Sequence, residues 1–123
     1  MKPSPEKTKL HALINEEIYP RCLETFANPL RIRIIKLLSE QPRTVTKLAE
    51  ATGAERSRVS HALQRLRHCK IVIAAKKGRE VTYSLNEESP FLRQKERGKE
   101  GGNLFSLIRE HVTTNCHDCL KEA

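Results

Sequence analysis

Apolar residues recur at helical spacing along most of the chain, and several of these segments begin at residues that cap helices. A first helix is expected to begin at Ser4 and Pro5, because serine caps the first turn and proline fits within it. Pro20 ends this helix or opens the next one. The first helix places Leu10, Leu13, Ile14 and Ile18 on one face, and a short segment then turns Leu23, Phe26 and Ala27 inward.

A longer helix is expected from Leu30 to about Glu40, directly after the start signal Asn28-Pro29. Its apolar residues cover more than half of its circumference, which predicts a central, buried helix. Residues 41–43, Gln-Pro-Arg, break it.

A helix-turn-helix follows this break. Thr44 is a candidate N-cap, Gly53 supplies a left-handed C-cap, and the next helix is expected from about Arg56 to His68. Two short helices joined by a tight glycine turn are typical of this motif. The buried side of the second helix is expected to contain Val59, Ala62, Leu63 and Leu66.

Two strands and a basic turn come next. Residues 71–75 are apolar and β-branched, and residues 81–85 alternate between apolar and polar, so both predict strands. Residues 76–79 form the turn between them, where Gly78 can adopt a positive φ. The helix-turn-helix and this hairpin together predict a winged helix.

The C-terminal part is polar first and helical afterwards. Residues 87–103 predict a partly ordered helix start and then a flexible loop, and Asn103 caps a last helix. Residues 113–115, Thr-Thr-Asn, are weak helix formers, so this helix ends early or kinks there. Its apolar face contains Leu104, Ile108, Val112, Cys116, Cys119 and Leu120.

Positive charge is concentrated in one stretch of the chain. The formal net charge is +8 at pH 7, and the 24 residues from Arg56 to Arg79 contain eight Lys or Arg and no Asp or Glu. The other residues therefore sum to zero. A local positive field attracts polyanions, because neutralised phosphates release their counterions. A charged run also fits a solvated face, but this run coincides with the helix-turn-helix and the hairpin, which favours DNA binding.

Composition argues against several classes of protein. No apolar run approaches the roughly 18–20 residues of a membrane span, and the first ten residues lack the apolar core of a signal peptide. Four cysteines are too few for a disulfide scaffold, so we expect a cytoplasmic protein with reduced thiols and no membrane partner. Few aromatic residues argue against stacking on single strands. No arrangement of catalytic residues is present in a plausible context, so we expect no enzyme.

Three motifs in order resemble the ArsR/SmtB family of small winged-helix transcription regulators. Asn-Pro-Leu-Arg from Asn28 resembles the start of the family's central helix. Ser-x-Val-Ser-His-x-Leu-x-x-Leu from Ser57 resembles the recognition helix, and Gly-Arg-x-x-x-Tyr-x-Leu from Gly78 resembles the wing. The resemblance covers about Phe26 to Leu85, roughly half of the chain.

The resemblance implies a homodimer that pairs mainly through the first and last helices. The apolar stripes at the two ends of the chain agree with this, since the central helices already suffice for one small core. We therefore expect a mainly α fold with a small β-hairpin, a winged helix-turn-helix. Its parts are N-terminal dimerisation helices (1–27), the winged helix (28–86), a flexible linker (87–103) and a C-terminal dimerisation helix with a C-x-x-C pair (104–123).

The chain departs from the family pattern at three places. Many members carry a thiolate site in the first helix of the helix-turn-helix, but residues 47–53 contain no Cys or His. Residues 109–111, Arg-Glu-His, lack the Asp-x-His spacing of the family's zinc site. The family usually has glycine after the recognition helix. Here Lys70 takes a left-handed conformation or the helix ends differently.

The exposed side of the helix at 56–68 is expected to enter the major groove of duplex DNA, where base pairs are distinguishable. There Arg58 pairs with guanine and Gln64 with adenine, whereas Ser60 and Thr46 suit phosphates. The wing tip reaches the adjacent minor groove or backbone. The complete set of expected DNA contacts is Thr46, Ser57, Arg58, Ser60, His61, Gln64, Arg65, Lys76, Lys77 and Arg79.

Cysteines are the candidate sensor. Cys116 and Cys119 form a C-x-x-C pair that places both sulfurs on one helix face, where they bind a thiophilic metal or arsenite or become oxidised. Cys22 lies in the N-terminal region, which the family fold places near the last helix. Both Cys116 and Cys119 also continue the apolar stripe, so simple packing stays open, as it does for Cys69. No cofactor is required, and we assign no metal site.

These observations predict a dimeric, sequence-specific regulator of transcription that binds an inverted repeat in duplex DNA. The expected mode is repression, with release by redox, metal or metalloid chemistry at Cys22, Cys116 and Cys119. One alternative is the same regulator without an inducer site. Another is a winged helix used as a protein-interaction module, against which the acid-free basic stretch argues.

Overall fold

The computed structural model describes residue 16, residues 18–92 and residues 104–114. The chain divides into two compact units, Met1–Ser84 and Leu85–Ala123, and each is described by itself. Within the described residues, no helix has the length and apolar character that crossing a membrane requires.

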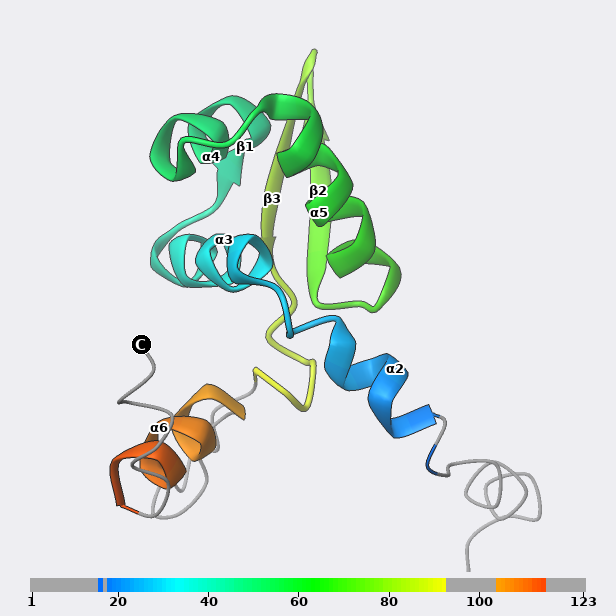
Figure 1. Ribbon diagram of the computed structural model, residues 1–123. Coiled ribbons are helices and arrows are strands. Elements are labelled where there is room, and N and C mark those ends of the chain that lie inside the picture. Colours follow the sequence, from blue (N-terminus) through cyan, green and yellow to red (C-terminus); the bar gives the residue numbers. More distant parts are fainter. Residues whose placement is uncertain (1–15, 17, 93–103, 115–123) are drawn as a thin grey trace, which may run out of the picture. The chain divides into compact units, whose positions relative to one another are not determined.

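The elements of the winged helix follow one another in the expected order (Figure 1). They are α2 (Ile18–Glu24), α3 (Pro29–Glu40), β1 (Arg43–Thr44), α4 (Val45–Thr52), α5 (Arg56–His68), β2 (Val72–Lys77) and β3 (Glu80–Leu85). Helices α4 and α5 form the helix-turn-helix, and strands β2 and β3 form the wing. The prediction of a mainly α winged helix-turn-helix is thereby confirmed.

The wing contains a third strand that the sequence analysis did not predict. The strand order is β1-β3-β2, and β1 pairs antiparallel with β3, with Arg43 opposite Tyr83 and Thr44 opposite Thr82. A strand of two residues shows no alternation of apolar and polar positions. For this reason the segment after α3 was predicted only as a break.

The core lies where α3, α4 and α5 meet the base of the hairpin. Helix α3 is central, as predicted, and buries Ile34, Ile35 and Leu38. Each buried aliphatic side chain of this kind contributes about 1.5–3 kcal/mol by leaving water. The most deeply buried apolar side chains are Ile34, Leu48, Val59, Leu63, Leu66, Ile71 and Val72.

Helix α2 buries less of its surface than expected. Pro20 lies in its first turn, so this proline opens the second helix. Phe26 is buried as predicted, but Leu23 is 54% exposed and Ala27 is also exposed, which corrects the expectation that all three face inward. Thr25 and Phe26 take the buried positions directly after α2, where the chain has left the helix, whereas Leu23 within the helix is exposed. The first helix, with Leu10, Leu13 and Ile14, lies outside the described residues.

Arg31 joins the end of α2 to the start of α3. Its Nη1 donates to the Glu24 carbonyl at 3.3 Å and to the Thr25 carbonyl at 3.5 Å. Its amide donates to Asn28 Oδ1 at 3.1 Å, which caps α3. One residue thus links the end of α2 to the start of α3.

Lys70 ends helix α5 in the left-handed conformation, with φ 63°. The Ile71 amide donates to the Leu66 carbonyl at 2.8 Å, and the Lys70 amide donates to the Arg67 carbonyl at 3.0 Å. This pair of bonds is the Schellman motif, in which the left-handed position is usually glycine. Of the two alternatives predicted for this segment, the first is therefore the correct one.

The described part of the second unit consists of turns and one helix, α6 (Leu104–Thr114). Residues 87–92 form turns instead of the expected helix start. Asn86 Oδ1 accepts from the Glu88 amide at 3.1 Å, and Pro90 disfavours a helical conformation at Ser89. The Leu104 amide donates to the Phe91 carbonyl at 2.9 Å. The predicted linker residues 93–103 lie outside the described part of the chain.

Candidate nucleic-acid interface

Helix α5 has one buried side and one exposed polar side. Val59, Ala62, Leu63 and Leu66 are buried, as predicted. The opposite side carries the residues expected to enter the major groove. Ser57, Arg58, Ser60, His61 and Gln64 are exposed, and Arg65 is half-buried. A rigid core therefore holds the back of this helix while its polar side faces outward.

The turn before α5 is held by local hydrogen bonds. Gly53 adopts φ 75°, and its amide donates to the Ala49 carbonyl at 2.9 Å. The buried Thr52 hydroxyl donates to the Leu48 carbonyl at 2.8 Å and accepts from the Ala54 amide at 3.3 Å. These bonds fix the angle between α4 and α5, and so the direction in which α5 presents its N-terminal half.

Thr46 lies in the first turn of α4 and is exposed. The side chain of its neighbour Thr44 accepts from the Lys47 amide at 3.3 Å, so Thr44 is the N-cap, as predicted. The Thr46 hydroxyl therefore stands at a helix N-terminus, where backbone N–H groups and the helix dipole favour phosphate oxygens.

Glu55 is a residue that the sequence analysis overlooked. It occupies the N-cap of α5, is exposed, and makes no side-chain capping bond. The acid-free stretch begins at the next residue, so the charge count excluded Glu55 by a single position. It adds a carboxylate beside Arg56 and Arg58 at the end of the helix that is expected to contact DNA.

The tip of the wing is a two-residue loop of Gly78 and Arg79. Gly78 has φ 61°, as the first position of a type II′ hairpin turn requires. Lys76 and Lys77 lie in β2 and not in the turn, which corrects the expected boundaries 76–79. Successive strand residues point to opposite faces, so these two lysines are directed to different sides of the wing. Glu80 directly opposes Lys77 across the loop.

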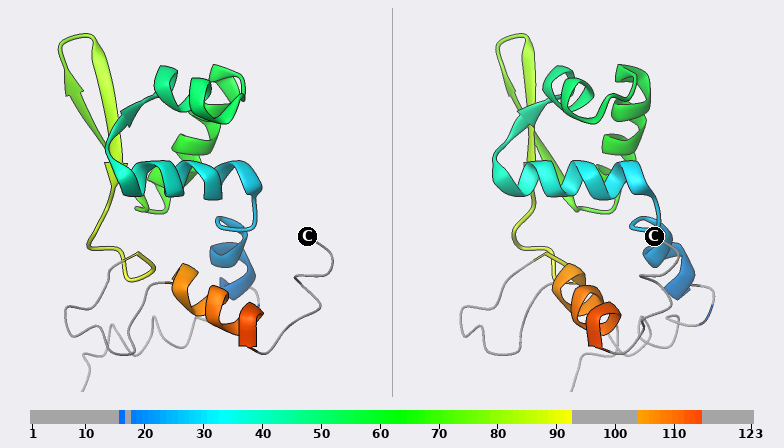
Figure 2. Two further views of the ribbon diagram at one scale, coloured as in Figure 1. Left: turned by 90° about the vertical axis from the view of Figure 1, so that its left-hand side faces the viewer. Right: turned by 60° about the vertical axis from the view of Figure 1, so that its left-hand side comes forward.

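The wing tip and the N-terminal half of α5 lie at the same end of the domain. Figure 1 shows the hairpin projecting past α4 and the start of α5, and both views in Figure 2 show the same relationship. Lys76, Lys77 and Arg79 are all exposed there. The basic side chains predicted from separate segments are thus presented on one end of the molecule.

The predicted thiol sensor is only partly described. Cys22 is exposed on α2, whereas Cys116 and Cys119 lie outside the described residues. Cys69 is also exposed, and its Sγ lies 3.3 Å from the Thr25 hydroxyl. Among the residues that the structure describes, no group of three His, Cys, Asp or Glu side chains is placed to hold a metal ion.

Comparisons with known proteins agree with this geometry. Residues 28–74 match the family model described as bacterial regulatory protein, arsR family. The HTH-type transcriptional regulator NmtR of Mycobacterium tuberculosis is 44% identical over 63 residues, which are 51% of this chain and 52% of the relative. The chain therefore spans about half the length of the curated relatives that it matches.

Two solved structures share the architecture. The crystal structure of M. tuberculosis Rv0081 is 28% identical, with a TM-score of 0.63, and the match covers 96% of this chain and 99% of that one. The solution structure of Mb0332 from Mycobacterium bovis, described as a homodimeric winged helix-turn-helix DNA-binding domain, is 25% identical with a TM-score of 0.59. That match covers 90% of this chain and 88% of Mb0332. Residues 28–74, at the centre of the winged helix, are therefore similar to the arsR family of bacterial regulatory proteins.

Proposed function

We propose that this chain is a transcription regulator that binds duplex DNA as a homodimer. Helix α5 enters the major groove, and the wing tip contacts the adjacent minor groove or backbone. The observation that carries the proposal is the exposed polar side of α5 beside the basic wing tip, at one end of the domain. The opposite side of α5 is buried in the core, so the orientation of the polar side is set by the fold.

Sequence specificity is expected to come from the exposed side chains of α5. Arg58 and Gln64 are both exposed on α5 and lie six residues apart. A guanidinium pairs with guanine O6 and N7, and a side-chain amide pairs with adenine N6 and N7. Thr46, Ser60 and the wing residues contact the sugar–phosphate backbone, which sets the register without reading bases.

Exposed apolar residues on the outer helices support a dimer. In the first unit, Tyr19 and Leu23 lie one turn apart on α2 and are 59% and 54% exposed. In the second unit, Leu107 and Ile108 of α6 are about half exposed. A twofold dimer carries two copies of α5, which match an inverted repeat with half-sites one helical turn or a multiple apart.

The proposal also covers the mode of regulation, which is repression of transcription under the control of cysteine thiols. A dimer bound over a promoter excludes other proteins from it, so loss of DNA binding restores transcription. Cys22 is solvent-accessible on α2, one of the two proposed dimer helices. Oxidation or thiophilic metal binding at Cys22, Cys116 and Cys119 would alter the dimer and so the spacing of the two α5 helices.

Selection from random duplex DNA tests this function directly. The full chain is used reduced, oxidised and loaded with a thiophilic metal, and the enriched sequences are determined. We expect an inverted repeat from the reduced protein and weaker enrichment from at least one of the other two. Failure to enrich any sequence from the reduced protein would overturn sequence-specific binding, and equal enrichment in all three would overturn thiol control.

A further inference from the structure

Strand β1 joins three elements through two adjacent residues. The backbones of Arg43 and Thr44 pair with Tyr83 and Thr82 of β3, the inner strand of the wing. The Thr44 hydroxyl caps α4 through the Lys47 amide. Strand β1, only two residues long, therefore attaches the inner strand of the wing to the helix-turn-helix, in addition to the packing of β2 against α5.

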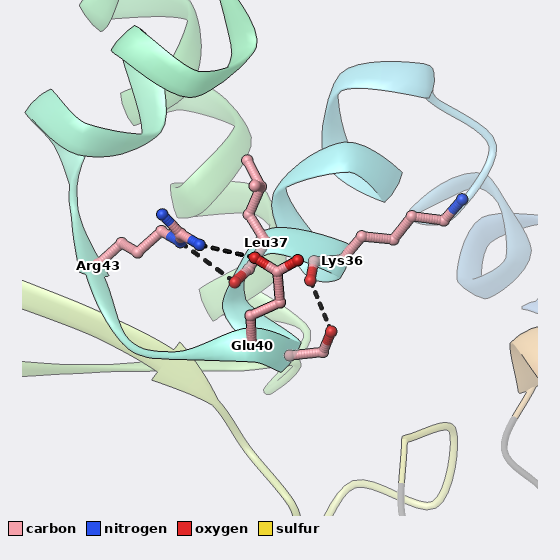
Figure 3. A network of polar contacts seen from close by, with 5 residues as sticks. Lys36, Leu37, Glu40 and Arg43 are labelled. Atoms are coloured by element: carbon pink, nitrogen blue, oxygen red, sulfur yellow. Dashed lines mark hydrogen bonds and ion pairs between the residues drawn. The ribbon is translucent and has the colours of Figure 1, made fainter.

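The Arg43 side chain fixes this strand to the end of α3. Its Nε donates to the Leu37 carbonyl at 3.2 Å, and its Nη2 donates to Glu40 Oε1 at 2.8 Å (Figure 3). The Leu37 carbonyl lies in the last turn of α3, and it also accepts from the Gln41 amide at 3.4 Å. Arg43 thus binds the last turn of α3 at two points.

The two side chains of the Arg43–Glu40 ion pair differ in their exposure to solvent. The Arg43 side chain is 16% exposed, whereas the Glu40 side chain is 66% exposed. An exposed ion pair contributes little, so the bond from Nε to the Leu37 carbonyl is the more important one. The planar guanidinium directs both N–H groups in a fixed geometry, which lysine does not reproduce.

We infer that Arg43 is a positioning residue for the wing. It fixes β1 against α3, β1 fixes β3, and β3 carries the loop that presents Arg79. Its backbone partner Tyr83 lies four residues beyond that loop, so Arg43 acts at the base of the wing, away from the tip. This inference rests on the proposed function, because positioning matters for affinity only when the wing contacts DNA.

A double-mutant cycle on DNA affinity tests this role. The effect of Arg79→Ala on affinity for the selected duplex is measured twice at one salt concentration, once in the natural chain and once in the Arg43→Ala variant. We expect Arg79→Ala to weaken binding about tenfold in the natural chain, and at most about twofold beside Arg43→Ala. An equal factor in both backgrounds would show that Arg43 affects stability alone, since lost folded protein lowers both affinities in proportion.

Two further variants keep the test decisive. Arg43→Lys retains the charge and is expected to fold, with the effect of Arg79→Ala again reduced to a few-fold. If Arg43→Ala fails to fold, an undiminished effect beside Arg43→Lys contradicts the inference. Glu40→Gln removes the exposed ion pair and keeps the bond to the Leu37 carbonyl, so it should leave the tenfold effect of Arg79→Ala almost intact.

Amide hydrogen exchange separates this inference from the proposed function. Without DNA, Arg43→Lys should accelerate exchange in β3 at least about tenfold more than in α5, because only the attachment of the wing is loosened. Equal acceleration in both elements would contradict positioning by Arg43. Absence of any duplex binding by the natural chain would instead overturn the proposed function.

Discussion

The Ile71 amide donates a 2.8 Å hydrogen bond to the Leu66 carbonyl, and both side chains are buried at the end of α5. This bond closes the helix around Lys70, which has φ 63°. A left-handed conformation costs a residue with a Cβ roughly 1–2 kcal/mol, whereas glycine adopts it freely. The end of α5 therefore forms in spite of the strain at Lys70, because backbone hydrogen bonds and the packing of the neighbouring side chains stabilise it.

Lys70→Gly should stabilise the domain. We expect the free energy of unfolding to rise by about 0.5–1 kcal/mol, because relief of the left-handed strain exceeds the added flexibility of the unfolded chain. Urea unfolding followed by circular dichroism measures the change. Lys70→Ala is the matched control, since it removes the same charge and keeps the Cβ. Equal stability of the two variants would show that Lys70 is not strained.

Arg58→Ala and Lys77→Ala should weaken DNA binding in different ways. Removal of Arg58 from the exposed side of α5 should cost about 1–3 kcal/mol on the selected duplex and relax specificity at one base pair. Removal of Lys77 should weaken all duplexes alike and reduce the salt slope by about one. Affinities on the selected duplex and on single-base variants distinguish these patterns.

Glu80→Gln should act in the opposite direction to Lys77→Ala. Glu80 directly opposes Lys77 across the wing loop, so its carboxylate offsets a charge that the DNA phosphates require. We expect a modest, sequence-independent gain in duplex affinity that disappears at high salt. A loss of affinity in this variant would show that Glu80 holds the wing in its binding conformation.

Paired substitutions Tyr19→Ser and Leu23→Ser should impair dimerisation without unfolding the winged helix. Both side chains are more than half exposed on α2, so their removal leaves the described core intact. Sedimentation velocity should show a shift towards monomer at micromolar concentration, and the urea midpoint at low protein concentration should change little. Leu48→Ala, in the fully buried core, should show the reverse, with a loss of about 2–5 kcal/mol in stability.

Thiol reagents should release the protein from DNA through particular cysteines. Peroxide or arsenite should lower the affinity of the reduced dimer, and a variant with serine at positions 22, 116 and 119 should no longer respond. A matched variant, Cys69→Ser, keeps a hydroxyl beside Thr25 Oγ1 and should respond like the natural chain. If the triple variant remains sensitive and Cys69→Ser does not, the sensor has been assigned to the wrong thiols.

The elements with strong local signals were predictable from the sequence. Asn28, Thr44 and Gly53 act at the helix ends where their chemistry placed them, and the period of α5 separated its buried side from its polar side. These features depend on bonds within a few residues. The expected order of helices and hairpin followed from them directly.

The features that were missed depend on contacts across the chain. Strand β1 exists because Arg43 and Thr44 meet β3, about forty residues later, and no local pattern signals it. Leu23 is as apolar as a core residue, yet it is 54% exposed on a helix that buries none of its residues. The division of Lys76 and Lys77 between two faces required knowing that β2 continues to Lys77.

The salt dependence of duplex binding tests the central claim most directly. Affinity of the full chain for its selected duplex is measured between about 50 and 200 mM salt, together with a scrambled duplex. Because several Lys and Arg of each protomer neutralise phosphates, log K should fall linearly with log salt, with a slope of about −5 or steeper, and the scrambled duplex should bind much more weakly. A slope near zero, or equal affinity for both duplexes, would contradict sequence-specific DNA binding through α5 and the wing.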